Sequence, residues 1–142
     1  MTFWLPDVNV WLAMHYPRHE HHGTAQAWFD RLDERQMLVF CRQTQLSFFR
    51  LLTTSAVMGK DTRTQRQCWT IYEDWLAGGR AVQQPEPPGI EAAFRPRTSG
   101  FDPAPKTWVD AYLAAFAETA GLTLVTFDKA LARTAKGAVL LG

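Results

Sequence analysis

The chain has 142 residues, of which 46% are hydrophobic and 20% are charged. This length and balance predict a single folded domain over residues 1–142 with a buried core, and they exclude an intrinsically disordered chain. The formal net charge of +1 neither indicates nor excludes a nucleic-acid partner.

The cysteines and the apolar runs predict a cytoplasmic protein with no membrane partner. Cys41 and Cys68 are too few and too far apart for a disulfide scaffold or a zinc knuckle, so we expect two buried thiols. No apolar run approaches the roughly 18 residues that cross a bilayer. Asp7 and Asn9 interrupt the first apolar segment, so we expect no secretory signal.

Short apolar runs alternate with amphipathic stretches along the chain. In chain order, the pattern predicts a strand at 2–5, helices at 8–14 and 24–36, a strand at 37–41, helices at 44–57 and 64–76, and a strand at 80–83. There follow at most a short helix starting within 85–89, an exposed loop over 95–105, a helix at 106–120, a strand at 122–126, a helix at 129–135 and a strand at 138–141. This alternation predicts an α/β fold with a parallel sheet that helices cover on both faces.

Two of the predicted strands deliver an aspartate at their carboxyl ends. Asp7 follows the first strand, and Asp128 follows the strand at 122–126. Ligands of a parallel sheet bind outside the carboxyl ends of its strands, so these side chains can converge. Asp110, early in the helix at 106–120, is a third candidate. Three carboxylates suffice for one Mg²⁺ ion, although each aspartate taken alone is more simply a helix cap or a surface charge.

Several segments resemble a known family in their order and spacing. They are Leu5-Pro6-Asp7-Val8-Asn9-Val10-Trp11-Leu12-Ala13, His19 to His22 with Ala25, Trp28 and Phe29, Cys41 to Leu52, Asp110-Ala111-Tyr112-Leu113-Ala114, and Leu124-Val125-Thr126-Phe127-Asp128. Together they resemble the PIN-domain ribonucleases, and specifically the VapC-type toxins of bacterial type II toxin–antitoxin systems.

The resemblance implies a PIN-like three-layer α/β/α sandwich with a central, mostly parallel sheet. It implies an endoribonuclease that uses Mg²⁺ or Mn²⁺, acts on RNA, forms a homodimer and is neutralised by a cognate VapB-type antitoxin. Carried over by position, Asp7, Asp110 and Asp128 are the catalytic metal ligands. Asn9, Thr126 and Thr44 are the polar residues that support the site, and such partners orient metal ligands.

The chain departs from the family pattern at Gln45, where the family typically has a glutamate after the threonine that corresponds to Thr44. A glutamine can offer a carbonyl oxygen, but it cannot neutralise a divalent ion or act as a base. Three hypotheses stay open: weaker metal binding in an active enzyme, an inactive form, or a nearby acid such as Glu118 or Asp102 in its place. We expect Gln45 to line the catalytic site and activity to persist at reduced efficiency. The rival is a module that binds antitoxin or RNA without cleavage.

Arg95, Arg97 and Lys106 flank the proline-punctuated loop before the Asp110 helix, so they are the candidate RNA contacts. A solvated surface is the more ordinary explanation for each basic residue singly. For tryptophans on helical faces, such as Trp108, the pattern favours core or partner-facing packing over base stacking.

Overall fold

A computed structural model describes residues 2–142 and shows a five-stranded sheet in the order β3-β2-β1-β4-β5. The strands are β1 Phe3–Pro6, β2 Met37–Phe40, β3 Ala81–Gln83, β4 Thr123–Thr126 and β5 Val139–Leu140. Every pairing between these strands is parallel, which confirms the predicted α/β fold. All strands therefore end at the same edge of the sheet, where both Asp7 and Asp128 follow.

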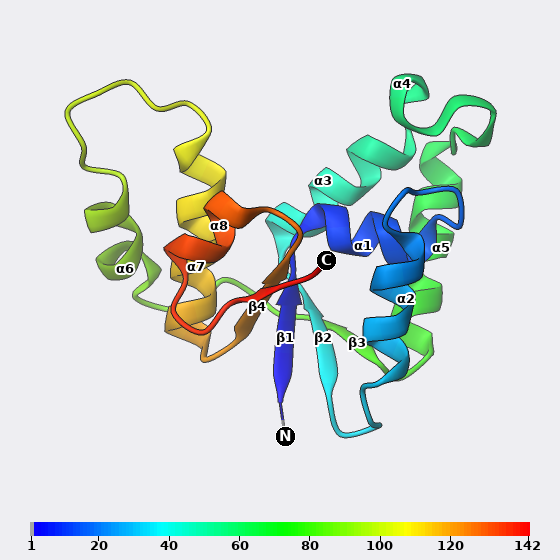
Figure 1. Ribbon diagram of the computed structural model, residues 1–142, viewed down its shortest axis with the longest axis horizontal. Coiled ribbons are helices and arrows are strands. Elements are labelled where there is room, and N and C mark those ends of the chain that lie inside the picture. The colour runs from blue at the N-terminus through cyan, green and yellow to red at the C-terminus, as the bar shows by residue number, and fades with distance from the viewer. Residues whose placement is uncertain (1) are drawn as a thin grey trace.

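Helices cover both faces of the sheet and complete a three-layer α/β/α sandwich (Figure 1). They are α1 Val8–His15, α2 His22–Asp30, α3 Arg42–Leu52, α4 Ser55–Met58, α5 Gln65–Ala77, α6 Ile90–Arg97, α7 Thr107–Ala120 and α8 Lys129–Thr134, with a short 3-10 turn at Gly59–Asp61. Residues of α1, α2, α3 and α5 share one buried core, and residues of α6, α7 and α8 share the other. The predicted sandwich is confirmed.

Successive side chains of β2 pack alternately into the two cores. Leu38 and Phe40 pack into the core under α1 and α3, whereas Val39 between them packs into the core under α7. On the first face, the fully buried Trp11 ring stacks on Phe40 with ring centroids 3.7 Å apart. Trp11 is therefore a core residue and is not available to bind a ligand. Cys41 and Cys68 are both buried free thiols, as expected.

The predicted helix at 24–36 is wrong at both ends, because α2 begins at His22 and ends at Asp30. A local turn competes with the end of that helix. The Asp33 carboxylate accepts a hydrogen bond from the amide of Arg35 (2.8 Å), and the Gln36 carboxamide accepts one from the amide of Asp33 (3.0 Å). Aspartate side chains favour such turns over helix continuation.

The predicted helix at 44–57 is two helices, α3 and α4. The hydroxyl of Thr53 donates to the carbonyl of Phe49 (2.9 Å), and that of Thr54 donates to the carbonyl of Arg50 (2.5 Å). These bonds close the last turn of α3 at Leu52. The predicted loop at 95–105 begins later, since α6 continues to Arg97 through Pro96.

The ends of α7 are close to the prediction. The helix ends at Ala120, and the capping residue Gly121 has a φ of 69°, a left-handed conformation that favours glycine. None of the helices in the described part of the chain is long and apolar enough to span a bilayer.

Candidate active site

The candidate site lies at the sheet edge where β1 and β4 end. These two strands pair directly, with Pro6 opposite Val125, and the amide of Asp7 donates to the carbonyl of Val125 (2.9 Å). The two residues that follow, Asp7 and Asp128, therefore come from neighbouring strands. Their predicted convergence follows from this strand order.

Asp7 is a buried carboxylate that also caps a helix. Its Oδ1 accepts hydrogen bonds from the backbone amides of Asn9 (3.0 Å) and Val10 (3.2 Å), and its Oδ2 accepts one from the Thr126 hydroxyl. Burial raises its pKa from 3.8 to about 6, against the opposing effect of these hydrogen bonds, and the charge of Asp128 adds to the rise. The Asp7 side chain therefore caps a helix and also lies at the candidate site.

Asp128 caps α8 in the same way. Its Oδ1 accepts from the amides of Ala130 (2.8 Å) and Leu131 (3.3 Å). The amide of Asp128 itself donates to Thr126 Oγ1 (2.9 Å). Thr126 is completely buried and makes hydrogen bonds with both Asp7 and Asp128, so the structure places it between the two aspartates.

Asp110 lies in the first turn of α7 and shares a cavity of about 560 Å³ with Asp128. Burial raises the pKa of Asp110, and the charge of Asp128 raises it further. Thr107 and Ala111 line the same cavity. Sequence analysis missed Thr107, although its spacing of three residues from Asp110 puts both on one helical face.

The donor set suits a hard divalent ion, although within residues 2–142 no three His, Cys, Asp or Glu side chains form a preformed cluster. Asp110 and Asp128 face one cavity, and Mg²⁺ is usually held by one or two carboxylates together with water and substrate oxygens. The charge of Asp128 acts on Asp7 and on Asp110, and it raises both pKa values. A bound cation would favour the charged forms of these carboxyl groups against the effects of burial and of their mutual repulsion.

The side chains of the other predicted site residues, Asn9, Thr44 and Gln45, make no hydrogen bond with the three aspartates within the described residues. Asn9 is exposed and contributes its backbone amide to Asp7. Thr44 is buried and bonds locally, accepting from the amide of Cys41 (3.1 Å) and donating to its carbonyl (3.1 Å). Gln45 is also buried, and its carbonyl oxygen accepts a hydrogen bond from the guanidinium of Arg42. The described contacts therefore connect Gln45 with Arg42 rather than with an aspartate.

Of the candidate RNA contacts, Arg97 and Lys106 line the acid cavity, while Arg95 lines a neighbouring hollow. The Arg97 guanidinium is ion-paired with Glu118 at 2.7 Å. The Arg95 guanidinium is paired with Glu91 at 3.2 Å. Glu118 is thus engaged by Arg97, and its predicted alternative role as a fourth acid gains no support.

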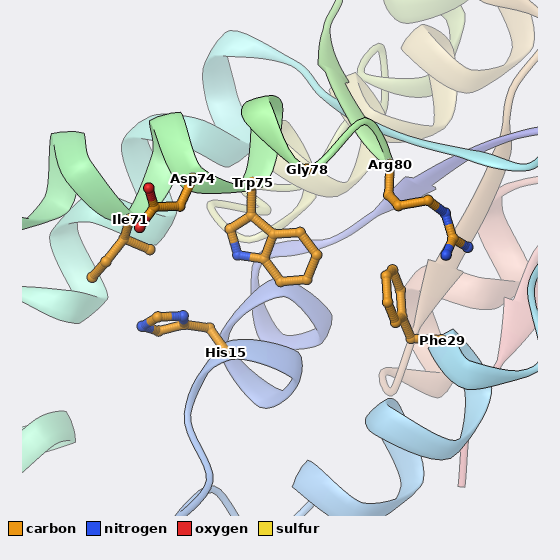
Figure 2. A pocket seen from close by; sticks show the side chains of 7 residues that line it. All are labelled: His15, Phe29, Ile71, Asp74, Trp75, Gly78 and Arg80. Atoms are coloured by element: carbon orange, nitrogen blue, oxygen red, sulfur yellow. The ribbon is translucent and has the colours of Figure 1, made fainter. Parts of the chain in front are cut away.

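A separate hollow of about 410 Å³ lies in the opposite helical layer, between α1, α2 and α5 (Figure 2). Trp75 stands in its middle, with His15 at one end and Arg80 over the Phe29 ring at the other, 4.7 Å from the ring centroid. Burial lowers the pKa of His15, and the charge of Arg63 lowers it further. These side chains form a mostly apolar surface that is remote from the acid cavity.

The fold and the acid cavity define a class: parallel α/β proteins with carboxylates gathered at the carboxyl edge of the sheet. The PIN domain family model matches residues 5–137. The chain belongs to the PIN-domain family, as the sequence segments predicted.

Two of the relatives that the chain resembles are named VapC proteins. The chain is 44% identical to ribonuclease VapC41 of Mycobacterium tuberculosis (strain CDC 1551 / Oshkosh) over 130 residues, which is 89% of each chain. Among solved structures, it is similar to VapC20 of Mycobacterium tuberculosis, a sarcin-ricin loop cleaving toxin, with a TM-score of 0.63, 14% identity, and 92% and 93% of the two chains covered. It is also similar to VapBC2 of Rickettsia felis bound to a DNA fragment from their promoter, with a TM-score of 0.67, 10% identity, and 98% and 97% covered. At these identities the two structures show the fold alone.

Proposed function

We propose that this protein is a metal-dependent endoribonuclease of the VapC toxin type. The observation that carries the proposal is the shared cavity of Asp110 and Asp128, beside the buried carboxylate of Asp7, at the carboxyl edge of the sheet. The 44% identity to a protein named ribonuclease VapC41 supports RNA as the substrate. The reaction is hydrolysis of a phosphodiester bond.

Asp110 and Asp128 would hold Mg²⁺ or Mn²⁺, with Asp7 as the third acid. The bound ion supplies a water of lowered pKa and stabilises charge on the phosphate. Thr126 keeps Asp7 and Asp128 in register, because its hydroxyl donates to one and accepts from the amide of the other. Lys106 lines the same cavity and would attract the phosphate.

Gln45 belongs to the proposed site as a neutral residue in the family's glutamate position. Its side-chain oxygen already accepts from Arg42, so it has less capacity to receive a metal or a water. We expect slower cleavage for this reason rather than none.

A VapB-type antitoxin is the proposed partner, together with a second copy of the chain in a cytoplasmic homodimer. The apolar hollow around Trp75 and Phe29 suits an apolar antitoxin segment, and it lies apart from the acid cavity (Figure 2).

The test is cleavage of a structured RNA by pure protein free of antitoxin, with Mg²⁺ or Mn²⁺, beside the variants Asp7→Asn and Asp33→Asn. Asp33 is an exposed aspartate whose carboxylate also accepts a hydrogen bond from a backbone amide, so its replacement is a matched control for the replacement of Asp7. Cleavage by the parent and Asp33→Asn, but not by Asp7→Asn, is the expected result. Identical traces from all three proteins would favour a non-catalytic binding module.

A further inference from the structure

A second hollow adjoins the acid cavity. It has a volume of about 760 Å³ and lies under the loop at 98–106, which joins α6 to α7. Arg97 and Thr107 line both spaces, so the hollow lies next to the acid cavity. In Figure 1 the loop rises at the upper left, on the side of the molecule where the strands end. A strand bound in the acid cavity therefore lies close to this hollow.

The hollow presents two aromatic rings that the fold leaves in water. Phe101 is fully exposed, and Trp108 is 56% exposed. Large apolar side chains that face solvent together usually mark a binding surface, because nothing in the fold gains from their exposure. The sequence pattern favours core or partner-facing packing for Trp108 over base stacking, and the half-exposed ring shows that the core uses only part of it.

The loop is held at both ends. At its start, the Thr98 hydroxyl donates to the carbonyl of Phe94 (3.1 Å) and the Ser99 hydroxyl donates to that of Arg95 (2.6 Å). At its end, the amide of Thr107 donates to the carbonyl of Ala104 (3.0 Å). Pro103 and Pro105 restrict the backbone between them. These hydrogen bonds fix the two ends of the loop beside α6 and α7, and so fix the region in which Phe101 stands.

We propose that this hollow binds an unpaired base of the RNA strand whose phosphate enters the acid cavity, stacking it on Phe101 and Trp108. The inference rests on the proposed ribonuclease function and names the two residues that would receive a base beside the acid cavity. Bases in a continuous duplex are already stacked and cannot enter, whereas unpaired bases can stack on aromatic side chains.

The charged residues around the two spaces determine which part of the RNA would enter each one. Lys106 is exposed and lines the acid cavity, so it draws the phosphate to that side. Asp102 lines the hollow and repels phosphate there, which leaves the hollow for the uncharged base. Because the exposed Lys106 in the adjoining acid cavity attracts a polyanion, the occupant is more simply a nucleic acid than an apolar protein segment.

The test is fluorescence anisotropy with a fluorescein-labelled single-stranded oligoribonucleotide of mixed sequence, in EDTA so that no cleavage occurs. Phe101→Ala and Trp108→Ala are each expected to weaken binding roughly 5- to 150-fold. Phe101→Tyr and Trp108→Phe are expected to keep most of the affinity, since both retain a ring. Trp69→Ala is the matched control, because Trp69 is 50% exposed on α5 in the other helical layer. A duplex of the same sequence should show no difference between the parent and the variants.

Unchanged affinity in both alanine variants would overturn the inference and leave the rings to a protein partner. An equal loss for single strand and duplex would also overturn it, because the contact would then be to the backbone. Cleavage assays with Mg²⁺ separate the two proposals. If the parent cleaves RNA and the alanine variants bind and cleave equally well, only the base-binding inference is contradicted. If the alanine variants lose single-strand binding but the parent cleaves no RNA, only the proposed ribonuclease function is contradicted.

Discussion

Replacing Asp7 by asparagine is expected to stabilise the metal-free protein while abolishing its proposed activity. The residue is 5% exposed, and burial raises its pKa from 3.8 to about 6. The folded chain therefore binds this proton more tightly than the unfolded chain, so folding stability falls as pH rises through the window between these values. At about 1.4 kcal/mol per pKa unit, the interval corresponds to about 3 kcal/mol of stability lost above the window.

Asparagine stays neutral at every pH and keeps most of the contacts. Its carbonyl oxygen can still accept from the amides of Asn9 and Val10, and the Thr126 hydroxyl can accept where it donated before. We therefore expect Asp7→Asn to exceed the parent by up to about 3 kcal/mol near pH 8 and by little near pH 4.

Urea unfolding in EDTA, at about pH 8 and about pH 4 and at one ionic strength, measures the difference in unfolding free energy between Asp7→Asn and the parent. Asp33→Asn is the matched control, because its exposed carboxylate also accepts an amide and its removal should shift neither curve. Equal stability of Asp7→Asn and the parent near pH 8 would refute the reasoning. So would a gain of the same size near pH 4, since the charge is then largely absent.

Mg²⁺ or Mn²⁺ is expected to raise the melting temperature of the parent and much less that of Asp110→Asn, because the cavity then keeps one carboxylate. An equal rise in scanning fluorimetry would contradict the site. Gln45→Glu is expected to tighten Mn²⁺ binding in calorimetry by adding a charge, and unchanged affinity would put residue 45 outside the site. Trp11→Ala is expected to cost about 3–5 kcal/mol in urea unfolding because the ring is fully buried. A loss below about 1 kcal/mol would contradict its packing. Lys106→Ala is expected to reduce the salt slope of RNA binding by about 1, and Arg97→Ala by less because its guanidinium is already ion-paired. Equal effects on the slope would contradict that difference.

The sheet and the positions of the aspartates could be predicted because each depends on a short stretch of sequence. Apolar runs of four or five residues identify the strands, and an aspartate directly after such a run lies at the strand's carboxyl end. The order of the strands then brings Asp7 and Asp128 together. Helix ends were less predictable, since the bonds of Thr53 and Thr54 stop α3 within an apolar pattern that continues.

The surroundings of the acids could not be predicted, because they depend on how separate helices pack. Whether Trp108 is buried depends on how much of its ring α6 covers through Phe94, whose ring centroid is 6.3 Å away. The engagement of Glu118 by Arg97 joins residues 21 positions apart on different helices. Helical periodicity identifies the face of one helix, but it does not tell which neighbour covers that face.

The two edges of the sheet limit how this protein can assemble. β3 has three residues and β5 has two, so neither edge offers more than a short row of free backbone groups. Another chain cannot gain much by adding a strand there, and uncontrolled edge-to-edge association is disfavoured for the same reason. A stable partner has to bind the helical layers, where contacts are made by side chains. The choice of partner therefore depends on surface side chains, which single substitutions can change one at a time. Closely related proteins of this fold can for this reason differ in what they bind.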